Sequence, residues 1–184
     1  PGSVRDSNRY ALMCAAQEAG ADVVWHGHAV DEEAQLENAM RAGLAHADVL
    51  LTSGGVSMGT RDLIKPLLEK LGRIEFGRVS FKPGKPLTFG HFRGVPVIGL
   101  PGNPASTLVT FGLLTRPYLL RRQGLADVTP LRFDMPAGFD WPKPGTRREY
   151  LRARIEQGQV RIYKNQSSGV LRSPAWAEGL VEVR

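Results

Sequence analysis

Apolar residues recur at helical spacing in four stretches of the chain. The spacing predicts helices over residues 8–19, 32–44, 62–71 and 105–122. Asp6 or Ser7 can cap the first helix, and Gly20 ends it. Asp31 is suited to cap the second helix, and Pro66 falls within the first turn of the third, where proline is tolerated.

Short apolar runs between the helices predict buried strands. These runs cover residues 21–25, 47–51, 74–81, 87–92 and 95–100. Gly77 interrupts the third run, and Arg93-Gly94 joins the last two into an expected hairpin. Because strands alternate with helices, we expect residues 1–125 to form a three-layer, mostly parallel α/β sheet with helices on both faces. This region opens on a helix, so we expect its first strand to be missing.

The pattern changes after Gly124. Residues 126–184 contain prolines at short intervals and three β-like runs, at 131–135, 150–155 and 160–163. Short runs separated by turn residues are typical of small β domains. We therefore expect a second, separate β domain over residues 126–184.

The composition is that of an ordinary globular protein, with 42% hydrophobic and 23% charged residues among 184. The formal net charge of +6 is compatible with nucleic acid, phosphate or oxyanion ligands, but charge alone does not favour these over a role in solubility. Basic residues are scattered, and no basic stripe carries interleaved aromatic residues, so we expect no nucleic-acid partner.

Membrane and secretion signals are not recognisable in the sequence. No apolar run approaches the roughly 20 residues that a membrane helix needs, and residues 1–6 do not resemble a signal peptide. Cys14 is the single cysteine, which excludes an intrachain disulfide and makes the cytoplasm the expected compartment. Because Cys14 lies in the apolar part of the first predicted helix, we expect it in the core rather than as a nucleophile.

A glycine-rich loop follows the predicted strand at 47–51. Ligands of open α/β sheets bind beyond the carboxyl ends of strands. Gly54 and Gly55 allow backbone N–H groups to approach an anion, while Ser53 and Ser57 add hydroxyl donors. The same glycines also suit a tight turn without any ligand. From the residues alone, an anion site and a tight turn without a ligand are equally supported for this loop.

Asp62 stands at the start of the helix that follows. The helix dipole favours an acidic residue in a first turn without any ligand, and this is the preferred interpretation from the residues alone. The alternative is a carboxylate that holds a phosphate-bridging Mg²⁺, since this cation prefers oxygen ligands.

The segment at residues 82–86 is more specific. Two prolines stiffen it and Gly84 lets it turn, which holds Lys82 and Lys85 near one another with no carboxylate between them in sequence. Two close ammonium groups repel unless an anion lies among them, so an anion site is favoured over a solvated surface loop. Ser106 lies in the first turn of the last predicted helix, where its hydroxyl can either bind an anion or cap the start of the helix.

The remaining polar groups carry weaker signals. Arg147 and Arg148 precede a predicted strand, and residues 166–169 form a polar turn. Alone, these are ordinary surface features. They can belong to the binding site only if the small domain faces the α/β loops. The four histidines lack metal-ligand spacing. We recognise neither a Walker loop nor a local signature of a catalytic triad.

Six segments in this order resemble those of the MoeA family of molybdopterin molybdenumtransferases, which includes the gephyrin E domain. The matching residues are 6–8, 52–59 with Asp62 and Lys65, 82–90, 100–106, 147–153 and 166–169. The resemblance implies a molybdopterin-binding α/β fold followed by a small, barrel-like β domain. It also implies a homodimer, with a molybdopterin adenylyltransferase as a further partner.

The resemblance further implies an enzyme of molybdenum cofactor biosynthesis. Such enzymes take adenylylated molybdopterin, release AMP and insert molybdate, with Mg²⁺ as the cofactor. By similarity, the catalytic residues are Asp62, which is also the metal ligand, Lys82 and Lys85. The implied substrate-binding residues are Asp6, Ser53, Gly54, Gly55, Ser57, Pro86, Ser106, Arg147 and Ser168.

Three alternatives share the expected fold. One is an adenylyltransferase-like enzyme, against which the small proline-rich domain argues. Another is a binding-only or scaffold domain, which would need a groove for a peptide partner. The third is a nucleotide-binding domain similar to that of competence proteins, which is not known for the lysine-containing loop at 82–86 or for the small domain.

Overall fold

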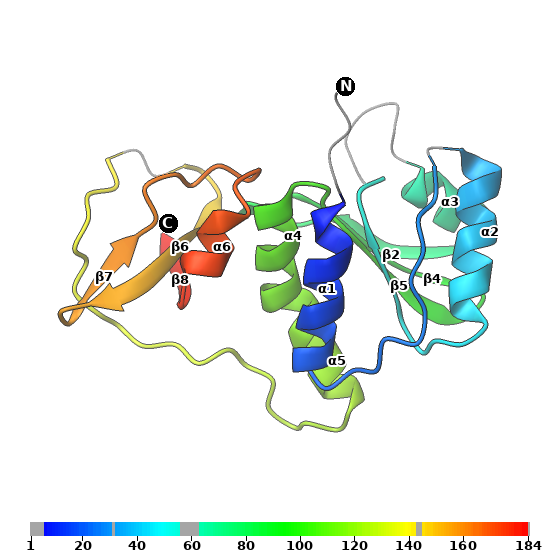
Figure 1. Ribbon diagram of the computed structural model, residues 1–184, viewed down its shortest axis with the longest axis horizontal. Coiled ribbons are helices and arrows are strands. Elements are labelled where there is room, and N and C mark those ends of the chain that lie inside the picture. Colours follow the sequence, from blue (N-terminus) through cyan, green and yellow to red (C-terminus); the bar gives the residue numbers. More distant parts are fainter. Residues whose placement is uncertain (1–5, 31, 56–62, 143–144, 184) are drawn as a thin grey trace.

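The computed structural model describes residues 6–30, 32–55, 63–142 and 145–183. The first part contains α1 (Ser7–Glu18), α2 (Glu33–Leu44), β1 (Leu50–Ser53), α3 (Ile64–Leu71), β2 (Gly72–Arg78), β3 (Phe81–Lys82), β4 (Pro86–Phe92), β5 (Val95–Leu100), α4 (Pro104–Thr110), η1 (Phe111–Thr115) and α5 (Arg116–Arg122). The second part contains β6 (Arg148–Glu156), β7 (Gln159–Ile162), α6 (Arg172–Trp176) and β8 (Gly179–Val183). Figure 1 shows the two parts side by side, with an extended segment leading from α5 to the smaller one.

The larger sheet has the strand order β1-β5-β4-β2. Only β1 and β5 pair in parallel, while β4 pairs antiparallel with both β5 and β2. The predicted α/β fold is confirmed, but among the described residues its sheet is mixed rather than mostly parallel. For β4 and β5 the reason is local, because Arg93 and Gly94 adopt positive φ angles of 52° and 84°, and a two-residue turn of this kind closes an antiparallel hairpin.

Helices cover both faces of this sheet, as predicted (Figure 1). Alternate residues of each strand point to opposite faces. Leu87 and Ile98 therefore pack with α1 and the helix of residues 104–122, whereas Phe92 and Val97 pack with α2 and α3.

The last helix of the larger part, at residues 104–122, contains a wider π-helical turn at η1. Pro117 lacks the N–H that would continue the regular pattern, and Arg116 N–H instead bonds to Phe111 O, five residues earlier. The helix predicted at 105–122 is thus confirmed with a local change of pitch.

Three sequence expectations are wrong. Residues 21–25 form no strand, because no described strand pairs with them, although Val23 still packs against the core. Residues 131–135 form no strand either, since Leu131 and Phe133 lie exposed with no sheet to cover them. Cys14 is exposed, because α1 buries Leu12 and Ala16 on the opposite side of the helix.

The smaller sheet is built around β6. Along one edge β6 pairs with β8, and along the other it pairs with β7 and, in parallel, with β3. Among the described residues this sheet is open and not barrel-like, since its edge strands do not pair with one another and closure requires that pairing. β3 comes from the first 125 residues, so a strand crosses the predicted domain boundary. The division at residue 125 stays a prediction.

Candidate functional site

A pocket of about 600 Å³ lies where the two parts of the chain meet. Six of the residues singled out from the sequence line it, namely Lys82, Lys85, Pro86, Ser106, Arg147 and Ser168. The first four come from the larger part and the last two from the smaller. The structure therefore brings together residues that lie up to 86 positions apart in the sequence.

The loop of residues 82–86 is held against the helix behind it. Gly84 has a φ of 116°, and a Cβ built on it would lie only 2.3 Å from Thr110 Oγ1. Glycine is thus required here both by the backbone conformation and by the close approach. On the other side, Val79 N–H donates to Lys85 O at 3.1 Å. These contacts set the position from which the two lysines reach the pocket.

Lys82 has a carboxylate partner that sequence reasoning missed. Its Nζ lies 3.0 Å from Glu149 Oε1, and Glu149 is only 6% exposed. The pair follows from the parallel register of β3 and β6, in which Lys82 is opposite Glu149. No carboxylate lies between the two lysines in the sequence, but in the folded chain the carboxylate of Glu149 contacts Lys82. The expectation that both lysines lack a carboxylate neighbour is therefore wrong. Glu149 fixes Lys82, and within the described part of the chain Lys85 has no carboxylate partner and carries the uncompensated charge of the loop.

The polar turn at residues 166–169 docks onto the larger part. Gln166 is clamped to β6, because its side chain accepts from Arg152 N–H at 3.0 Å and donates to Arg152 O at 3.0 Å. Ser168 O then accepts from Ala105 N–H at 2.9 Å, and Ser168 Oγ accepts from the Asn103 amide at 3.1 Å. The small domain thus faces the α/β loops, which was the condition for its residues to belong to the site.

Ser106 is 4% exposed and lies in the first turn of α4 beside this contact. Its hydroxyl has no hydrogen-bond partner among the described residues, and the residue lines the pocket. Ala105 N–H is already taken by Ser168 O, so only part of the expected set of free helix-terminal N–H groups is available.

Arg152 also lines the pocket and was not singled out from the sequence as a site residue. It is 1% exposed, and burial lowers the pKa of its guanidinium. Arg152 lies within segment 147–153, one of the six that resemble the MoeA family, and this segment was a sequence signal that could have singled it out.

The described residues of the glycine loop, 53–55, do not line the pocket, and Gly54 lies against Gly102, the neighbour of pocket-lining Asn103. Gly54 and Gly55 adopt φ angles of 84° and 67°. Asn8 ties the loop to its neighbour, because its amide donates to both Ser53 Oγ and Gly102 O at 2.8 Å. The turn interpretation accounts for these observations, and a ligand role for Ser53, Gly54 and Gly55 stays a prediction.

Asp6 is not among the residues that line the pocket. Asp6 caps α1 by accepting from Arg9 N–H at 3.1 Å. Ser57 and Asp62 lie outside the described residues. The N-cap position of α2 is Glu32, next to Asp31, which also lies outside the described part.

The walls of the pocket are strongly cationic. Among the described residues they carry Lys82, Lys85, Arg147 and Arg152 against the carboxylate of Glu149, which leaves three positive charges in excess within that part. Such a surface attracts anions and can hold a tetrahedral oxyanion through charge-assisted hydrogen bonds.

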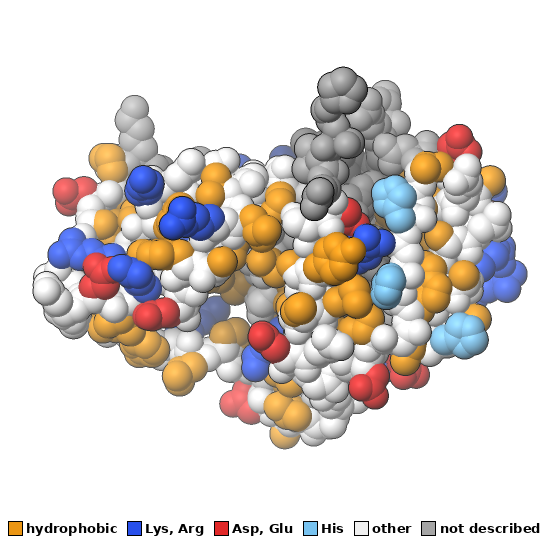
Figure 2. All heavy atoms as spheres, viewed as in Figure 1, with side chains coloured by type: hydrophobic (Ala, Val, Ile, Leu, Met, Phe, Trp, Pro, Cys, Tyr) orange, Lys and Arg blue, Asp and Glu red, His pale blue; other side chains and the backbone are white. Residues whose placement is uncertain are grey.

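No cluster of three or more metal-binding side chains occurs within the described residues. Figure 2 likewise shows the histidine side chains of one face as separate patches. The described part of the pocket offers one carboxylate, and Lys82 already binds it. The described pocket residues alone do not fit a metal site.

No described helix is long and apolar enough to cross a membrane.

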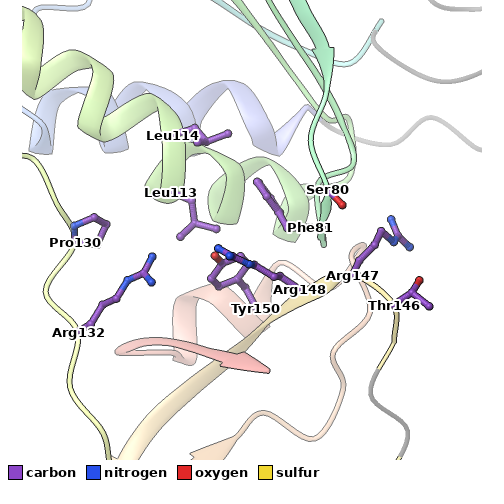
Figure 3. A pocket seen from close by; sticks show the side chains of 10 residues that line it. All are labelled: Ser80, Phe81, Leu113, Leu114, Pro130, Arg132, Thr146, Arg147, Arg148 and Tyr150. Carbon is purple, nitrogen blue, oxygen red and sulfur yellow. The ribbon is translucent and has the colours of Figure 1, made fainter. Parts of the chain in front are cut away.

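A second cavity of about 640 Å³ lies between the π-helical turn and the small domain (Figure 3). Leu113 forms part of its apolar wall, and Arg132 and Arg148 reach toward it. Glu182 lies 3.4 Å from Arg132 and 3.6 Å from Arg148, so its carboxylate offsets one of the three positive charges of Arg132, Arg147 and Arg148, which leaves one fewer in excess than in the described part of the first pocket. The first pocket is therefore the stronger anion site.

The chain matches two sequence families. Residues 1–121 match one described as "Probable molybdopterin binding domain". Residues 134–184 match another described as "MoeA C-terminal region (domain IV)". The chain belongs to the MoeA family. The resemblance inferred from the six segments is thereby confirmed.

Named relatives agree with this membership in the MoeA family. The molybdopterin molybdenumtransferase of Haemophilus influenzae is 36% identical over 165 residues, which cover 88% of this chain and 41% of that protein. Molybdopterin molybdenumtransferase 2 of Mycobacterium tuberculosis is 33% identical, with 100% of this chain and 47% of that protein covered. A solved MoeA protein of Pyrococcus horikoshii superposes with a TM-score of 0.80 at 31% identity, covering 100% of this chain and 45% of that one. The chain thus spans less than half the length of these relatives.

Proposed function

We propose that this chain carries the molybdopterin- and oxyanion-binding part of a molybdopterin molybdenumtransferase, an enzyme that inserts molybdenum from molybdate into molybdopterin. The observation that carries the proposal is the cationic pocket, in which described residues of both family-matched regions meet with three positive charges in excess among them. Relatives named for this activity support the reaction class.

In the proposed reaction, Lys82, Lys85 and Arg147 bind the oxyanion groups of the two substrates. Molybdate is a tetrahedral dianion, and phosphate groups of the pterin substrate have similar geometry and charge. Ammonium and guanidinium donors hold such groups without any dedicated metal ligand. Glu149 keeps Lys82 in place through their 3.0 Å ion pair, and Ser106 adds a hydroxyl donor from the helix start.

The proposal includes adenylylated molybdopterin as the substrate, AMP as the leaving product and Mg²⁺ as the cofactor. A divalent cation would offset the phosphate charge while the adenylate is cleaved. Asp62 is the proposed ligand and lies outside the described residues. A cytoplasmic homodimer and an adenylyltransferase partner complete the proposal, and both rest on the family resemblance.

The proposed oxyanion site is tested with Lys85→Ala in the full chain. Molybdate affinity is measured by isothermal titration at constant ionic strength, with Mg²⁺ and separately with a chelator. We expect Kd to rise about 10- to 100-fold, since a hydrogen bond to a charged group contributes about 1.5–3 kcal/mol.

Lys70→Ala is the matched control, because Lys70 is an exposed lysine that pairs with Glu33 and does not line the pocket. Its Kd for molybdate should stay within about two-fold of the wild type, as expected for a screened surface charge. Equal affinities of the wild type and Lys85→Ala would refute the assigned role of Lys85.

A further inference from the structure

Arg152 is a buried cation without a carboxylate partner among the described residues. Its side chain is 1% exposed, on the central strand of the small domain. Nε donates to Ser173 Oγ at 3.1 Å, and one terminal nitrogen donates to Ser167 O at 3.3 Å. Both acceptors are neutral, and the other terminal nitrogen has no hydrogen bond within the described part of the chain.

A guanidinium in this position is unfavourable by itself. Burial removes hydration from the charge, and two neutral acceptors replace only part of it. Buried arginines are usually paired with carboxylates or with ligand anions, because the planar fork of donors matches such groups. Since the described protein supplies no anion here, the missing counterion is expected to be a ligand.

The position of Arg152 fits that expectation. It lines the same pocket as Lys82, Lys85 and Arg147, whose charges already attract anions. Its donor to Ser167 O also ties it to the turn that docks on α4 through Ser168. An anion bound at Arg152 would therefore lie against both parts of the chain.

We propose that Arg152 is an oxyanion-binding residue of the pocket and contacts one tetrahedral oxyanion group of a substrate directly. The shared chemistry is that of molybdate and of a phosphate group, and both are present in the proposed reaction. This inference rests on the proposed function, but it assigns to the small domain a buried binding group rather than only a covering role.

The test compares molybdate and inorganic phosphate as separate probes in isothermal titrations of the full chain at constant ionic strength. Arg152→Met keeps the length of the side chain but removes its charge. We expect this variant to bind at least one of the two probes about ten-fold or more weakly, in line with the loss of a charge-assisted hydrogen bond. Loss for molybdate alone identifies molybdate as the bound group, and loss for phosphate alone identifies a phosphate.

Two variants separate binding from folding. Arg154→Met removes a cation of the same strand that packs on Trp176 and does not line the pocket, so both affinities should remain unchanged. Ser173→Ala removes the acceptor of Arg152 Nε and should lower the melting temperature while it preserves anion affinity. If Ser173→Ala loses as much affinity as Arg152→Met, Arg152 acts only through the position of the turn, and the proposal is overturned.

A spectroscopic measurement covers the case in which Arg152→Met fails to fold. In the ¹⁵N-labelled wild type, the Arg152 side-chain N–H resonance should shift on titration with the probe that binds, whereas that of Arg154 should not. An unshifted Arg152 resonance at saturation overturns the proposal. If neither probe binds the wild type, the proposed function itself fails, whereas equal binding by wild type and Arg152→Met defeats only the present inference.

Discussion

Gly84 is the residue of the loop at 82–86 that we expect to tolerate substitution least. Its φ of 116° lies in a region that L-residues rarely adopt. A Cβ at this position would also meet Thr110 Oγ1 at 2.3 Å and Phe81 Cε2 at 3.0 Å. Thr110 is fully buried in the helix behind the loop, so it cannot move aside easily. Gly84→Ala therefore combines backbone strain with a steric clash.

The expected cost follows from these two effects. A left-handed backbone conformation costs an L-residue roughly 1–2 kcal/mol. Overpacking a filled interior adds about 1–3 kcal/mol. The free energy of unfolding should thus fall by about 2–5 kcal/mol, and at about 2–4 °C per kcal/mol the melting temperature should fall by about 4–20 °C.

Two further variants separate the two contributions. Gly158 has a φ of +74° in the β6–β7 turn with open space around it, so Gly158→Ala should show the backbone cost alone. In the double variant Gly84→Ala/Thr110→Ala, loss of the Thr110 hydroxyl removes the 2.3 Å contact and should restore part of the stability. The free energies of unfolding of the wild type and of these three variants are compared by urea unfolding monitored by circular dichroism.

The same variants test whether the loop positions its lysines. Molybdate affinity should fall in Gly84→Ala, because the displaced loop carries Lys82 and Lys85, and should stay unchanged in Gly158→Ala. If Gly84→Ala is no less stable than Gly158→Ala, the clash with Thr110 has no effect on stability, and the predicted cost is wrong.

Two other predictions concern the partners of the pocket residues. Glu149→Gln should bind molybdate more tightly than the wild type in isothermal titration, because Lys82 loses its carboxylate partner and the pocket gains one unit of positive charge. Weaker binding would contradict this and show that the positioning of Lys82 by Glu149 contributes more to affinity than the charge that Glu149 neutralises. Gln166→Ala should lower the free energy of unfolding by about 1–3 kcal/mol in urea, since Arg152 N–H loses its acceptor while Arg152 O and Tyr163 O each lose a donor. Unchanged stability would show that these backbone groups do not depend on Gln166.

Local features of this chain were readable from its sequence. The four helices follow from apolar spacing, and the hairpin follows from Arg93-Gly94, whose positive φ angles suit a tight turn. The strands β6 and β7 were also predicted, at residues 150–155 and 160–163. These features depend on neighbouring residues, so the order of residues along the chain is sufficient to indicate them.

The site was predictable only in part, because its charges are paired across long sequence distances. The sequence indicated an anion-binding loop at Lys82 and Lys85, and the structure brings this loop to Arg147 in one pocket. Only the register of β3 against β6 places Glu149 beside Lys82, 67 positions away. Only the packing of the small domain buries Arg152 without a carboxylate partner among the described residues. Sequence determined which charged groups are available, and tertiary packing decided which of them are neutralised within the described structure and which are left to bind an anion.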